Sequence, residues 1–99
     1  MKVEIGKRAR RQAERASSWW EENRPQAPLL FEDELGRALQ QLLSVPRSGV
    51  LYPTKKRPEL RRILLPKTEY HVYFALERGG TVIVIHALWG ALRGREPKL

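Results

Sequence analysis

Basic side chains gather in the second half of the sequence, where their types and spacing suit the binding of anions. Lys55-Lys56-Arg57 form one run, Arg61-Arg62 form a second, and Arg93 and Arg95 stand near the end. Phosphate binding requires several such charges on one face, because each contact neutralises one negative charge. These residues are candidates for binding a phosphate or an acidic partner, and a solvated basic surface is the alternative interpretation.

Residues that could perform acid–base or nucleophilic chemistry are few. The two histidines, His71 and His86, fall in different expected strands, and two histidines alone do not make a metal site. The sequence has no cysteine, no Gly-rich phosphate loop and no serine in an elbow motif. Tyr52, Tyr70 and Tyr73 would act as acid or base only if they faced the basic set. We therefore expect no metal, no cofactor and no catalytic residue set.

Composition limits the range of functions further. The chain has 99 residues and a net charge of +8, which indicates one domain over residues 1–99 and favours nucleic acid or an acidic protein as partner. Two basic blocks, residues 1–15 and 46–71, flank an acidic block at 16–45. The sequence shows no apolar run of transmembrane length and no signal-peptide core. We expect a cytoplasmic protein with no membrane partner and no small-molecule substrate.

The first half of the sequence predicts a short strand and two helices that would carry the site. Val3 and Ile5 alternate with charged residues, as in a strand. Alanines and Trp20 recur at helical spacing over 7–24. A second helix is expected to start within 25–28, with proline in its first turn, and to end near Pro46. The two helices should pack as an antiparallel hairpin, and residues 46–59 should form a loop.

The second half predicts three strands, at 60–65, 70–76 and 81–88, with a Gly turn at 77–80 between the last two. Alternation in 70–76 indicates one buried face, whereas the continuous apolar run of 81–88 indicates burial on both faces. The remaining residues should form a short extension. The predicted fold is α+β with two layers in the order β-α-α-β-β-β. A helical hairpin packs on a mostly antiparallel twisted sheet, and the first strand pairs beside the last.

The order of several motifs resembles a known family. The C-terminal pattern runs from Arg61-Arg62-Ile-Leu-Leu-Pro through Tyr70-His71 and a Gly turn to Thr81–Trp89, followed by Arg93-Gly94-Arg95-Glu-Pro97. With the Trp19-Trp20 region, the 31–43 stripe and Pro46-Arg-Ser-Gly49, it resembles the RelE/ParE toxins of bacterial type II toxin–antitoxin systems, closest to the ParE (plasmid stabilisation) branch. The likeness spans essentially the whole chain.

The resemblance implies a toxin that is neutralised by a cognate antitoxin, whose wrapping segment is often acidic. ParE-type members are associated with DNA gyrase and are not nucleases, whereas RelE-type members cleave ribosome-bound mRNA with a basic cluster and commonly a late tyrosine. The last tyrosine of this chain is Tyr73, which favours the ParE branch. One departure is Gly90, which stands where ParE-like tails often carry histidine after the tryptophan.

Two sets of site residues follow from these alternatives. For binding of the target or antitoxin, the candidates are Lys55, Lys56, Arg57, Arg62, Trp89, Arg93 and Arg95. For an mRNA endonuclease, Lys55, Arg57, Arg62 and Arg93 would hold phosphate, with His86 or Tyr70 as acid or base. A non-enzymatic nucleic-acid-binding domain is a third possibility.

Overall fold

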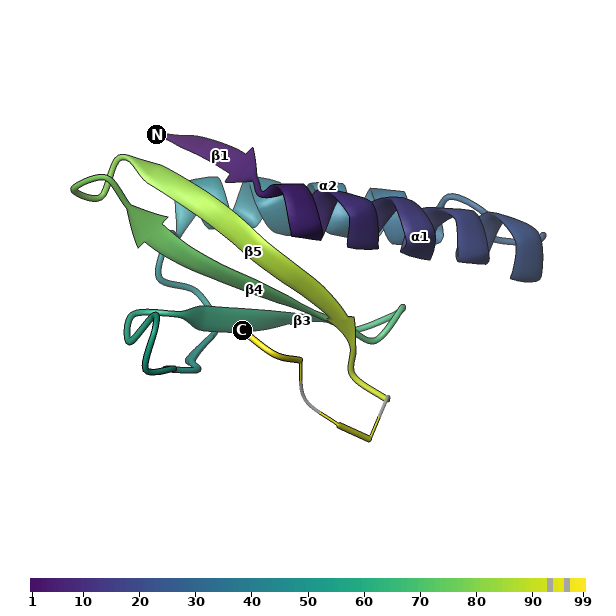
Figure 1. Cartoon of the computed structure of the whole chain (residues 1–99). Coiled ribbons are helices and arrows are strands. Elements are labelled where there is room, and N and C mark those ends of the chain that lie inside the picture. Colours follow the sequence, from purple (N-terminus) through teal and green to yellow (C-terminus); the bar gives the residue numbers. More distant parts are fainter. Residues whose placement is uncertain (93, 96) are drawn as a thin grey trace.

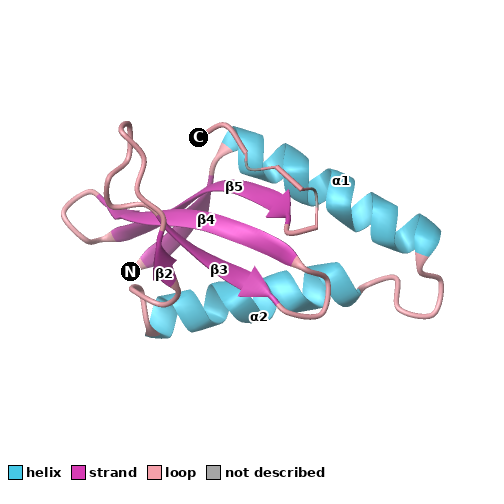
Figure 2. Cartoon of the chain, turned by 90° about the horizontal axis from the view of Figure 1, so that it is seen from below, coloured by secondary structure: helices cyan, strands magenta, loops and turns pink. Residues whose placement is uncertain are grey.

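The computed structural model of the chain describes residues 1–92, 94–95 and 97–99. Two helices lie side by side on one face of a five-stranded sheet, which confirms the predicted two-layer α+β fold (Figures 1 and 2). The elements are β1 (Lys2–Ile5), α1 (Lys7–Asn23), α2 (Leu30–Ser44), β2 (Val50–Leu51), β3 (Arg61–Leu65), β4 (Tyr70–Glu77) and β5 (Val82–Gly90).

The sheet has the strand order β1-β5-β4-β3-β2 and is mostly antiparallel. The first strand pairs with β5, as predicted, and it does so in parallel, with Val3 opposite Ile83. β4 and β5 form the longest ladder, from Tyr70 opposite Gly90 to Glu77 opposite Val82. A register shift between Tyr73 and Phe74 interrupts this ladder. The hydrogen bonds of this long central ladder fix the positions of the side chains at both of its ends.

The helices bury one stripe each against the sheet. Ala9 and Ala16 of α1 are buried, and their small side chains let the helix backbone approach β5 closely. α2 buries Phe31, Ala38 and Leu42 in the same core. Contrary to the prediction, α2 does not begin within 25–28. Residues 24–30 form two turns in which Ala27 N–H donates to the Arg24 carbonyl and Leu30 N–H donates to the Ala27 carbonyl.

The second face of the sheet is covered as well, which contradicts the prediction of one buried face for residues 70–76. Tyr73 and Ala75 are fully buried on this face with Leu60 and Ala87. The covering comes from the segment before β3 and from the C-terminal segment, since Leu99 packs on this second core. The chain end at 97–99 therefore lies back over the sheet, whereas a short extension was predicted. The double burial expected of β5 is confirmed.

A short strand, β2, lies within the region predicted to be a loop. Val50 and Leu51 pair with Arg62 and Arg61. Gly49 precedes them with φ +78°, a conformation that side chains disfavour, and a Cβ there would lie 2.2 Å from the Arg62 carbonyl oxygen. The pairing therefore depends on a glycine that lets two backbones approach closely.

Candidate functional site

Arg62 forms the centre of a basic and aromatic group on the second face of the sheet. Its register partner is Tyr73, so both side chains point to the same face. The guanidinium carbon lies 4.8 Å from the centre of the Tyr52 ring, and Nη1 donates a hydrogen bond of 3.4 Å to the Tyr73 hydroxyl. Among the described residues, no carboxylate lies within ion-pair distance of Arg62. The arginine is held by aromatic rings and its positive charge stays uncompensated.

Three more side chains extend this group along the ends of β4 and β5. His71 pairs in register with Trp89, and its ring lies 6.1 Å from that of Tyr73. The Trp89 indole N–H donates to the Arg95 carbonyl at 2.9 Å, while the Arg95 guanidinium carbon lies 5.7 Å from the Trp89 ring. These residues line a pocket of about 320 Å³. We call Arg62, His71, Tyr73, Trp89 and Arg95 the Arg62 cluster.

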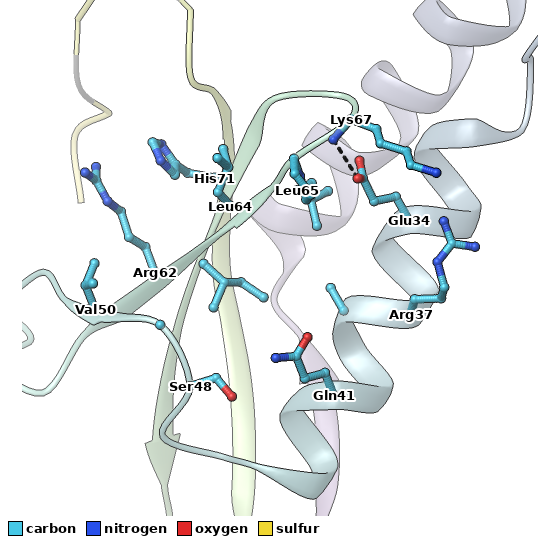
Figure 3. Close-up of a pocket in the computed structure, with 14 residues that line it drawn as sticks. Glu34, Arg37, Gln41, Ser48, Val50, Arg62, Leu64, Leu65, Lys67 and His71 are labelled. Carbon is cyan, nitrogen blue, oxygen red and sulfur yellow. Dashed lines mark hydrogen bonds between the residues drawn. The ribbon is translucent and has the colours of Figure 1, made fainter.

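An open groove of about 800 Å³ continues from the cluster between α2 and β3 (Figure 3). Arg62 and His71 line both hollows, and Figure 3 shows them on the side away from α2. The β2 strand pairs only with Arg61 and Arg62, so within the described structure the outer backbone edge of residues 63–65 has no strand partner. Val50 and Leu64 on the groove wall are exposed. We call this hollow the edge groove.

The acidic side chain on the edge groove is already satisfied internally. Glu34 is only 6% exposed, and its carboxylate accepts hydrogen bonds from the Lys67 N–H at 2.7 Å, the Thr68 N–H at 2.9 Å and the Thr68 hydroxyl at 2.7 Å. Burial opposes the charged form, but these hydrogen bonds outweigh burial and lower the pKa of Glu34. The groove therefore offers a partner the cations Arg37, Arg62 and Lys67.

The remaining residues proposed from sequence lie elsewhere. Lys56 and Arg57 line a separate cavity near the start of α1, together with His86. His86 is hydrogen-bonded through Nε2 to Glu77, and it lies at the β4–β5 register shift, away from His71. Lys55 is exposed and lines none of these hollows.

Tyr70 lies on the helix side of the sheet, edge-on to Phe31 at 5.1 Å between ring centres. Arg93 lies outside the described residues. Of the tyrosines considered from sequence, Tyr52 and Tyr73 do face Arg62, whereas His71 was not selected for the site. Strand register is the signal that could have placed these side chains. An antiparallel β3–β4 pair puts Tyr73 opposite Arg62, and successive side chains of each strand then alternate between the two faces of the sheet.

Two further properties bear on the chemistry open to this chain. Within the described ranges, no three His, Asp or Glu residues gather in a way that could hold a metal ion. No described helix has the length and apolar character needed to cross a bilayer.

Comparisons with known proteins give a fold but no sequence family. No protein-family model matches the sequence, and neither does any curated protein. A chain of the chromosomal ParDE TA system from P. aeruginosa superposes with a TM-score of 0.72 at 16% identity, covering 91% of this chain and 95% of the other. The chain has the RelE/ParE toxin fold.

Two structures of the E. coli RelE toxin resemble the chain more loosely. The isolated toxin superposes with a TM-score of 0.55 at 18% identity, covering 93% of this chain and 85% of the other. A mutant of the same toxin in the free state superposes with a TM-score of 0.54 at 15% identity, covering 93% and 84%. The resemblance inferred from sequence order is thus confirmed for the RelE/ParE fold, and of these three structures the ParDE chain agrees best.

Proposed function

We propose that this protein is the toxin of a type II toxin–antitoxin system, that it acts as ParE-type toxins do by binding DNA gyrase, and that a cognate antitoxin neutralises it. The observation that carries the proposal is the near-complete superposition on a chain of a ParDE system, over 91% of this chain and 95% of that one. The net charge of +8 supports a negatively charged macromolecular partner.

The arrangement of the Arg62 cluster favours binding over cleavage. A general acid or base must come within hydrogen-bond reach of the reacting group. Tyr70 packs on Phe31 beneath the helices, and His86 is engaged by Glu77 beside another cavity. Tyr73 does contact Arg62, but it is only 1% exposed. The cluster presents cations and aromatic rings, which are the side chains that dominate protein interfaces.

The RelE-like alternative has one observation in its favour. His71 lines the same pocket as Arg62 and is partly exposed, so an mRNA endonuclease would pair these two residues rather than use Tyr70 or His86. Cleavage of ribosome-bound mRNA that is lost in both His71→Ala and Arg62→Ala would establish this alternative and exclude the gyrase proposal.

The edge groove is the surface that best fits the antitoxin. An extended segment can add a strand to an open sheet edge, with its backbone giving affinity and its side chains giving specificity. Residues 63–65 offer such an edge, Val50 and Leu64 offer exposed apolar contact, and Arg37 and Lys67 offer charges for acidic side chains. An acidic antitoxin segment with alternating apolar residues would therefore bind along β3.

Expression in bacteria tests the proposal. We expect the wild-type chain and Arg11→Ala to stop growth, and Arg62→Ala to lose most of this effect, because Arg11 lies on the outer face of α1, away from the Arg62 cluster. Co-expression of the cognate antitoxin should restore growth. Growth unaffected by the wild-type chain, with soluble folded protein present, would contradict the proposal.

A further inference from the structure

A second cavity, of about 440 Å³, lies where α1 begins. Four segments that are far apart in the sequence line it: the first turn of α1, the loop before β3, His86 of β5, and the last residues of the chain. Leu60 lines this cavity and belongs to the second core, which also contains Tyr73 of the Arg62 cluster. The two hollows share no lining residue among the described ones, so this cavity is a separate feature. We call it the α1 cavity.

Most of the side chains that line the α1 cavity are cationic. They are Lys7, Arg8, Lys56, Arg57 and Lys98, with His86, and no described Asp or Glu lines the wall. Within the described structure none of the five Lys and Arg side chains takes part in an ion pair. Lys7 and Lys56 are exposed and have no side-chain hydrogen bond among the described residues. Like charges gathered around one hollow repel one another, so an anion bound here would relieve an unfavourable arrangement.

The backbone at this cavity adds to the same preference. Gly6 caps α1 and offers no side-chain acceptor, and the first turn contains no acidic residue. The positive end of the helix and its first N–H groups are therefore not neutralised by the chain's own side chains. Alone this would not define a site, but here it coincides with five cations that line one hollow.

We propose that the α1 cavity binds phosphate groups. Several cations in one small hollow match the dense charge of phosphate, and the arginine fork fits its oxygens in pairs. An acidic peptide fits less well, because its charges are spaced along an extended chain and it needs apolar contacts, while the cavity offers only Leu60 and Leu99 for these. The phosphate could come from a free nucleoside polyphosphate or from the backbone of a nucleic acid.

Calorimetric titration of the purified chain tests this, with inorganic pyrophosphate, ATP, a short single-stranded DNA and an oligo-glutamate peptide as probes. We expect Lys7→Gln and Lys56→Gln each to weaken phosphate binding about tenfold, the usual loss for one charge-assisted contact. Arg11→Gln removes the same charge from the outer face of α1, and should change binding less than about twofold. Circular dichroism should show that all three variants stay folded.

The outcomes separate the phosphate sources. If pyrophosphate and ATP bind saturably and DNA binds no more tightly than they do, the result supports a free phosphorylated ligand. Tighter binding of DNA, with a salt dependence reduced in Lys7→Gln, supports a nucleic-acid backbone. The proposal is overturned if no phosphate probe binds, if Arg11→Gln loses as much as Lys7→Gln, or if oligo-glutamate binds equally well at these lysines. None of these results depends on whether the chain arrests growth.

Discussion

Individual residues in this protein divide sharply into those whose charge is satisfied within the chain and those whose charge is left for a partner. Glu34 is buried and accepts three hydrogen bonds from the β3–β4 turn. Arg62 is packed between tyrosine groups and has no carboxylate among its described neighbours. The first arrangement stabilises the fold, and the second leaves a cation at the place where the Arg62 cluster and the edge groove meet.

Glu34→Gln should lower the free energy of unfolding by about 1–3 kcal/mol at neutral pH, because the amide NH₂ would face a backbone N–H donor where the carboxylate offers an acceptor oxygen. The pKa of Glu34 is lowered by folding, so its contribution is present above the ordinary value of 4.5 and is lost as pH falls through the folded value. Urea unfolding at neutral and acid pH should show the difference between wild type and variant shrinking in acid.

Glu22→Gln serves as the control for this measurement, since Glu22 is exposed and makes no hydrogen bond or ion pair with the described residues. It should unfold as the wild type does at both pH values. A Glu34→Gln protein as stable as wild type at neutral pH would show that the carboxylate does not fasten α2 to the turn.

At the scale of elements, most of the fold could be predicted, because the spacing of apolar residues along the sequence shows which face of a helix or strand is buried. Ala9, Ala16 and Phe31 fall on helical stripes that are indeed buried. The β2 strand could not be predicted, since two exposed residues carry no periodic signal. The double burial of β4 escaped prediction for a related reason. In the sequence, Tyr73 and Ala75 lie on the face of β4 that is expected to be exposed. They become part of a second core only because Leu60 and Leu99 pack over that face.

The site was less predictable than the fold because it depends on which strands become neighbours. Arg62 was a candidate from its charge alone, but its contact with Tyr73 depends on the β3–β4 register. Lys56 and Arg57, adjacent to Lys55 in sequence, line a different cavity, because the loop carries them towards the start of α1. A run of charges in the sequence is therefore not a single surface.

Gly49→Ala should destabilise the protein by about 1–3 kcal/mol, because the position has a positive φ and the new Cβ would overlap the Arg62 carbonyl oxygen. Gly36→Ala is the matched control in α2, where a Cβ meets nothing within 4 Å. That substitution should stabilise by about 0.5–1 kcal/mol, since alanine favours helix. Thermal unfolding should show that Gly49→Ala is less stable than wild type and that Gly36→Ala is more stable. Equal changes in stability for the two variants would refute the close approach of β2 to β3.

Leu64→Lys should weaken antitoxin binding at least about tenfold, because it places a charge on the exposed apolar wall of the edge groove. Leu29→Lys makes the same change at a residue that is also exposed but lies outside the groove, and it should bind normally. Titration of each variant with the antitoxin measures the difference. Equal loss in both would place the antitoxin elsewhere.

The whole molecule buries apolar side chains in two cores, and its excess positive charge lies on the surface around them. The helices cover one face of the sheet, while the C-terminal segment and the loop before β3 cover the other (Figure 1). The Arg62 cluster, the edge groove and the α1 cavity lie around these cores. Cations line each of these hollows, as the proposed binding of larger, negatively charged partners requires.

The supercoiling activity of purified DNA gyrase, measured with increasing amounts of this protein, tests the central claim most directly. We predict that the wild-type chain inhibits supercoiling and leaves cleaved DNA, and that Arg62→Ala is at least about tenfold weaker. Arg11→Ala should act like wild type. Supercoiling that is unchanged at high excess of folded wild-type protein would contradict the account.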